Sequence, residues 1–95
     1  MADKININWF KVRIAPHLDN YVLNYRHFEN GDFGDLNQVE FNSEEKGGEI
    51  DFWSSGYLSI HFVSYIGGEE LINAFFSPEE EKRKIEVFKM LKSMI

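Results

Sequence analysis

The sequence predicts an α+β fold: a three- to four-stranded antiparallel sheet with a C-terminal helix packed on one face and an N-terminal helix or strand. Between residues 36 and 76, short runs of alternating apolar and polar residues are typical of strands, and glycine-containing turns separate them. Residues 77–95 have helical periodicity with a recognisable start. A length of 95 residues suits one domain, which we expect to span residues 1–95.

The N-terminal third contains two segments whose periodicities compete. Residues 9–14 alternate apolar and basic side chains, which predicts a short strand, with a helical turn as the alternative. Residues 17–28 follow helical spacing from Leu18 to Tyr25, but Tyr21, Leu23 and Tyr25 also alternate as in a strand. We favour a helix for residues 17–28 and leave the strand open. Residues 29–35 are rich in glycine, asparagine and aspartate and predict a turn.

The middle of the chain predicts a meander of strands. Alternation favours strands at residues 36–42, 49–54 and 57–66, joined by a charged loop at 43–48 and a Ser55-Gly56 turn. After a turn at 67–70, residues 71–76 are either a fourth strand or a short buried segment. The alternation directs Ile50, Phe52 and Ile60 towards a core.

The C-terminal segment predicts an amphipathic helix. Ser77 is expected as the N-cap, with Pro78 in the first turn and Glu80 completing a capping box. The apolar stripe expected to cover the sheet is Ile85, Phe88, Leu91 and Ile95.

The opposite face of the predicted sheet combines aromatic and acidic side chains. Tryptophan and tyrosine supply much of the binding energy in protein interfaces, and an acidic rim speeds encounter with a basic partner. The alternative is that Trp53 and Tyr57 pack beneath the N-terminal segment as a second small core. The candidate partner-binding residues are Glu40, Asp51, Trp53, Tyr57, His61, Tyr65, Glu69 and Glu70.

Composition bounds the function classes. The absence of cysteine excludes disulfides, thiol nucleophiles and thiolate zinc sites. The three histidines have no metal-ligand spacing, and no catalytic motif is visible, so we expect neither catalytic residues, nor a metal, nor a cofactor. A net charge of −6 argues against direct nucleic-acid binding. We expect a cytoplasmic protein without membrane contact, with a monomer favoured and the oligomeric state left open.

The run GGEIDFWSSGYLSI, the following GGEEL-N turn and the acidic helix start resemble a known family. Over Gly47–Asn73 the chain resembles the small cytoplasmic immunity proteins of bacterial polymorphic toxin systems, especially those of contact-dependent growth inhibition. The resemblance implies a non-enzymatic protein that binds and neutralises one cognate toxin domain, often a basic nuclease. The alternative is a small metal- or ligand-dependent enzyme or regulatory domain on the same scaffold.

Overall fold

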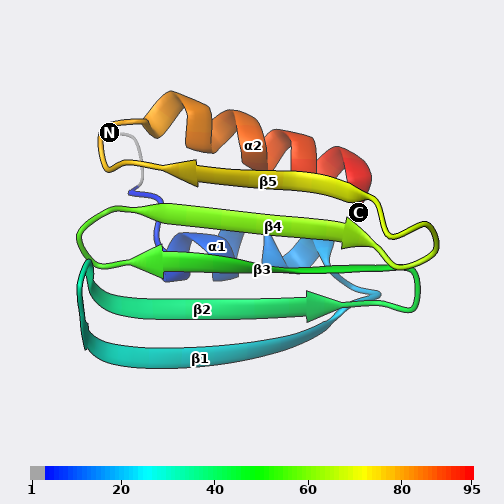
Figure 1. Cartoon of the computed structure of the whole chain (residues 1–95), viewed down its shortest axis with the longest axis horizontal. Helices are drawn as coiled ribbons and strands as arrows, with labels where there is room; N and C mark the ends of the chain where they lie inside the picture. Colours follow the sequence, from blue (N-terminus) through cyan, green and yellow to red (C-terminus); the bar gives the residue numbers. More distant parts are fainter. Residues whose placement is uncertain (1–3) are drawn as a thin grey trace.

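A five-stranded antiparallel sheet with two α-helices forms the molecule, in a computed structural model that describes residues 4–95 (Figure 1). The strands follow one another across the sheet in chain order, from β1 to β5, so every neighbouring pair is a hairpin. The α+β class, the antiparallel sheet and the C-terminal helix are confirmed. The expected three to four strands are too few, because a segment predicted to favour a helix forms an additional strand.

That additional strand is β1, which runs from Val22 to Gly31. The helix favoured over residues 17–28 is therefore wrong, and the strand left open is what forms. A short 3-10 helix, η1, occupies Ala15–His17 and precedes it. Helical spacing would have buried Val22, but this side chain is 66% exposed. Pairing with β2 supplies the backbone hydrogen-bond partners that make the extended form stable.

The N-terminal helix α1 covers Ile7–Arg13, where we expected a strand and held a helical turn as the alternative. The Asn6 side chain caps it by accepting a hydrogen bond of 3.0 Å from the Trp9 backbone N–H. Phe10 and Ile14, one helical turn apart, are both fully buried. Burial of this i, i+4 pair explains why the helix is preferred to the alternating pattern.

The remaining strands lie close to their predicted positions. They are β2 (Gly34–Asn42), β3 (Lys46–Trp53), β4 (Leu58–Ser64) and β5 (Glu70–Phe76). Residues 71–76 belong to a strand, and the simple meander order is confirmed. β4 is shorter than expected, since Tyr65 and Ile66 lie in the following turn.

The C-terminal helix α2 runs from Glu81 to Met94, later than predicted. The capping box on Ser77 does not form: Glu80 is the N-cap and makes no side-chain cap hydrogen bond. The buried stripe is also different from the predicted one, because Ile85 is 41% exposed. The residues of α2 that face the sheet are Lys84, Val87, Phe88 and Leu91.

Lys84 carries a charge, yet its side chain is only 2% exposed. It occupies a position of α2 where an apolar residue would be expected. Its ammonium group donates to the backbone oxygen of Gly56 at 2.7 Å and lies 3.3 Å from the Glu81 carboxylate. A buried ammonium is tolerated only when such partners replace water. Lys84 therefore ties the β3–β4 turn to the start of α2.

Both helices pack on the same face of the sheet, which we call the inner face. The Phe52 ring of β3 lies 5.9 Å from Phe10 of α1 and 6.3 Å from Phe88 of α2, measured between ring centroids. Trp9 and Phe88 join the two helices at 4.9 Å. Because the N-terminal segment lies on this face, the alternative of a second core beneath it around Trp53 is wrong.

Candidate functional site

The opposite side of the sheet, which we call the outer face, carries no helix from the described residues 4–95 (Figure 1). The pairing register places its side chains in rows that cross the strands. One row contains Glu40, Glu49, His61 and Asn73, and the next row contains Gln38, Asp51, Ser59 and Phe75. A face with this composition remains open to a partner.

Four carboxylates form an acidic band on the outer face: Glu40, Glu49, Asp51 and Glu70. Arg26 of β1 offsets part of the charge through an ion pair of 3.1 Å with Glu40. Glu70 lies 3.4 Å from the imidazole of His61, with both side chains about half exposed. Since the carboxylates outnumber Arg26, the band favours a cationic partner.

Asp51 is held in a fixed orientation. Its two carboxylate oxygens each accept one hydrogen bond, from the Gln38 amide and from the Ser59 hydroxyl, both at 2.9 Å. These three side chains come from neighbouring strands, so the sheet itself fixes the position of the charge. A preorganised charge loses little conformational entropy on binding.

Glu49 lies at the centre of the acidic band, where the neighbouring carboxylates repel its charge. Partial burial raises the pKa of its carboxyl group, and the charges of Asp51 and Glu40 raise this pKa further. Arg26 and His61 act in the opposite direction and lower it. A cationic group bound at this point would relieve the repulsion among the carboxylates.

An aromatic cluster lies beside the acidic band, at the end of the sheet where β3 turns into β4. It consists of Phe33, Trp53, Tyr57 and Phe75, whose ring centroids are 4.6–6.4 Å apart in the contacts that link them. Phe33 and Phe75 remain 41% and 53% exposed. Exposed aromatic side chains of this kind are typical of protein interfaces.

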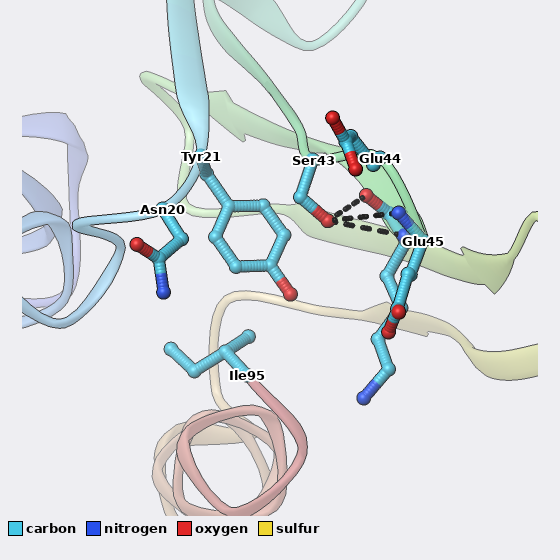
Figure 2. Close-up of a pocket in the computed structure, with 7 residues that line it drawn as sticks. Asn20, Tyr21, Ser43, Glu44, Glu45 and Ile95 are labelled. Carbon is cyan, nitrogen blue, oxygen red and sulfur yellow. Dashed lines mark hydrogen bonds between the residues drawn. The ribbon is translucent and has the colours of Figure 1, made fainter.

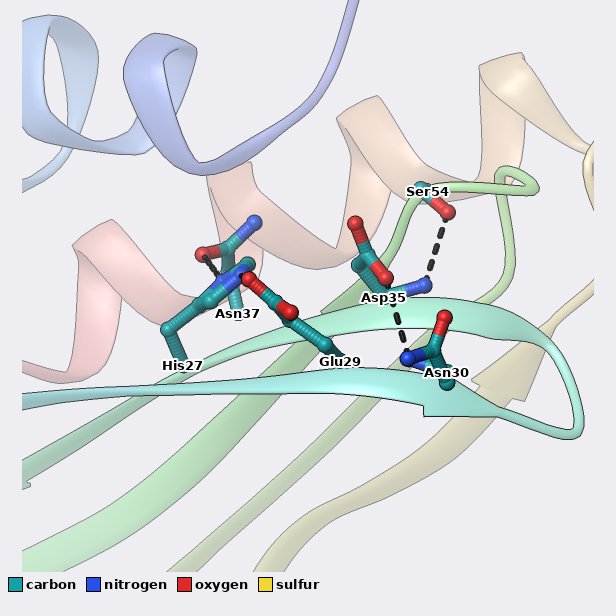
Figure 3. Close-up of polar contacts among 6 residues, drawn as sticks. All are labelled: His27, Glu29, Asn30, Asp35, Asn37 and Ser54. Carbon is teal, nitrogen blue, oxygen red and sulfur yellow. Dashed lines mark hydrogen bonds and ion pairs between the residues drawn. The ribbon is translucent and has the colours of Figure 1, made fainter.

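Backbone and hydroxyl hydrogen bonds position the cluster. The β1–β2 hairpin bends back over the sheet, with Asn30 at a positive φ of 60°. Asp35 joins this hairpin to the β3–β4 turn: its N–H donates to the Ser54 hydroxyl at 2.9 Å, and its carboxylate accepts from the Asn30 N–H at 3.1 Å (Figure 3). The Ser55 hydroxyl donates to the Phe33 carbonyl. Phe33 is thereby held against Trp53 and Tyr57.

Tyr65 crosses the opposite end of the outer face. Its hydroxyl donates a hydrogen bond to the Asn42 side chain, and its ring lies over Gly47. A Cβ at Gly47 would collide with the Tyr65 hydroxyl, so only glycine leaves room for the ring. The side chain is 49% exposed.

The structure brings most of the predicted site residues together on the outer face. Five of them project from strands on that face: Glu40, Asp51, Trp53, His61 and Glu70. Tyr57 belongs to the aromatic cluster at one end and Tyr65 lies at the other. Glu69 lies in the β4–β5 turn, where its side chain lies beside Gly67.

Sequence reasoning missed Phe33, Phe75 and Glu49. Alternation continued through β5 would have placed Phe75 on the outer face, and alternation through β3 would have placed Glu49 beside Asp51. Phe33 gives no such signal, because it lies in a turn. Only the fold of the hairpin brings it onto the cluster.

A separate cavity of about 460 Å³ lies between Tyr21, the β2–β3 turn and Ile95 (Figure 2). Burial and the nearby Glu45 carboxylate raise the pKa of the Tyr21 hydroxyl, while a hydrogen bond with Ser43 opposes them. The Ser43 hydroxyl is already engaged, since it donates to the Lys46 carbonyl at 3.1 Å. The predicted site residues lie outside this cavity.

Within residues 4–95, no three histidine, aspartate or glutamate side chains gather in a way that could hold a metal ion. Neither described helix combines the length and apolar character needed to cross a bilayer.

Comparison with known proteins finds no matching family model, no matching curated protein and no matching solved structure. What the chain binds is therefore inferred from its own sequence and side chains.

Proposed function

We propose that this chain is a non-enzymatic immunity protein that binds a cognate toxin domain in the cytoplasm and neutralises it by covering part of its surface. The observation that carries the proposal is the open outer face, on which an aromatic cluster adjoins an acidic band. The resemblance of Gly47–Asn73 to immunity proteins of contact-dependent growth inhibition systems specifies the kind of partner.

The two parts of the outer face have different roles in the proposed complex. Trp53, Tyr57 and Phe75 supply apolar area that is already ordered by their mutual contacts, so little side-chain entropy is lost on binding. The acidic band attracts and orients a basic domain, for which a nuclease is the leading candidate.

If the proposal holds, the cognate toxin domain is encoded directly upstream of this chain. Co-purification with that domain tests the proposal, together with rescue of growth in cells that express it. We expect a stable complex and full rescue. A folded toxin domain that neither co-purifies with this chain nor loses toxicity in its presence would contradict the proposed function.

Matched variants test the proposed surface. F75A on the outer face and M90A on α2 remove side chains of similar exposure, 53% and 48%. F75A should weaken binding by about 30-fold, as expected for loss of an interface anchor worth about 2 kcal/mol, and M90A should not. Equal effects of the two variants would place the toxin elsewhere on the protein.

A second matched pair tests the acidic band. Glu70 lies on the outer face, whereas Glu86 is an exposed residue of α2. E70K should slow association by about tenfold at low ionic strength, with the effect fading as salt is added. E86K carries the same charge change and should leave the association rate close to that of the parent protein.

A further inference from the structure

The two edges of the sheet differ in what lies beside them. α2 runs along β5 (Figure 1). A groove lined by Leu71, Ala74 and Met90 lies between the two elements. β1 forms the opposite edge, with no described element of residues 4–95 beyond it (Figure 1). Every residue of β1 except Leu23 is exposed. One side of its backbone therefore presents N–H and C=O groups without strand partners.

β1 has few of the features that normally protect an edge, since its charged residues are Arg26 and Glu29. It is 10 residues long and contains neither proline nor lysine, and its irregularity is confined to the end between Phe28 and Gly31. Three large apolar side chains project from it, since Val22, Tyr25 and Phe28 are 66%, 43% and 50% exposed. Such an edge can accept another extended strand.

The sequence of β1 is complementary to itself. We propose that two copies of this chain pair antiparallel through their β1 edges, around a two-fold axis at Tyr25, to form one continuous sheet. In this register Val22 lies opposite the partner's Phe28, and Tyr25 lies opposite the partner's Tyr25. A β-branched residue facing an aromatic one is a favourable cross-strand pair. The exposed apolar residues of β1 are then all covered by one another.

The charged residues of β1 favour the same register. Pairing about Tyr25 places Arg26 opposite the partner's Asn24. Pairing about Arg26 would place it opposite the partner's Arg26, where like charges destabilise the pair. Pairing about His27 would instead set Arg26 against the partner's Phe28 and leave Val22 uncovered. A register of the other parity would set an inner-face side chain opposite an outer-face side chain, which a two-fold axis perpendicular to the sheet does not allow.

This pairing replaces the expectation of a monomer and does not depend on what the outer face binds. The two-fold axis runs perpendicular to the sheet, so the two outer faces lie side by side on one side of the dimer. The helices of both copies lie on the other side.

Sedimentation velocity of the full chain over a range of concentrations tests the proposal, and we expect a monomer–dimer equilibrium.

V22K/F28K places lysine opposite lysine and should raise the dissociation constant by about tenfold or more. V22E/F28K places glutamate opposite lysine and should restore the dimer. Within one chain these positions are about 20 Å apart along the strand, too far to pair directly. I66K adds a lysine at a 78% exposed site in the β4–β5 turn, and this control should have no effect.

Cysteine cross-linking tests the register, because the natural chain contains no cysteine. Among the single variants N24C, Y25C and R26C, Y25C should form the disulfide-linked dimer fastest, since only residue 25 faces its own copy. A monomer at every concentration would overturn the proposal. So would a dimer that V22K/F28K leaves intact, or one that cross-links fastest through residue 24 or 26.

Discussion

Phe52 and Trp53 are neighbours in β3, but they belong to opposite faces of the sheet. Phe52 is 4% exposed and packs between Phe10 and Phe88 from the two helices. The Trp53 ring instead packs against Phe33 and Phe75, which are themselves exposed at the surface. The two aromatic residues thus have different roles, because both helices lie on one side of the sheet. Alanine at Phe52 should mainly reduce stability, whereas alanine at Trp53 should mainly reduce binding.

F52A should have the largest effect on stability. Removal of the ring leaves a cavity between the sheet and both helices, and the free energy of unfolding should fall by about 3–5 kcal/mol. Urea unfolding followed by circular dichroism measures the loss. A loss below about 1 kcal/mol would mean that the inner face is not the packed core described here.

K84M should rank second. Methionine keeps the apolar stem but removes the donor to the Gly56 carbonyl, so we expect a loss of about 1–3 kcal/mol. The same unfolding measurement applies, with K82M at an exposed position of α2 as the control. If K84M is as stable as K82M, the hydrogen bonds of Lys84 contribute nothing to the free energy of unfolding.

W53A should cost about 0.5–1.5 kcal/mol of stability, since it removes contacts within the aromatic cluster but leaves the core filled. The loss in the free energy of toxin binding should be larger than this loss of stability. Calorimetric titration with the toxin domain, beside the unfolding curve, compares the two quantities. A variant that unfolds as readily as F52A would show that the cluster is a second core.

E49Q should have the smallest effect, a gain of less than about 0.5 kcal/mol at neutral pH. Burial and the neighbouring carboxylates raise the pKa of Glu49 in the folded protein, so the ionised carboxylate opposes folding above that pKa. The advantage of glutamine should disappear as pH falls through the raised pKa towards the ordinary value of 4.5. Unfolding curves from pH 4 to pH 8, with E86Q as the control, would detect it. A gain that persists at low pH would contradict the acidic band as its cause.

The α+β class, the meander order and the alternation within β2, β3 and β4 followed from local sequence. Alternation alone predicts that Asp51, Trp53 and His61 share one face, and the pairing register agrees. Period two is a property of every strand, so it needs no knowledge of what packs against the sheet.

The N-terminal third and the start of α2 did not follow from local sequence. Residues 17–28 satisfy both periods, and only pairing with β2 made the strand β1 the lower free-energy form. A lysine is ordinarily expected at the surface. Lys84 is buried because the carbonyl of Gly56, which is distant in the chain, accepts its hydrogen bond.

The sequence by itself determined which side chains share a face of each strand, because alternation is a local backbone property. Only the tertiary structure decided that both helices cover the inner face and leave the other open. It also brought Phe33 from a turn onto Trp53 and exposed the edge of β1. These features depend on contacts between distant segments, whose free energies no local pattern encodes.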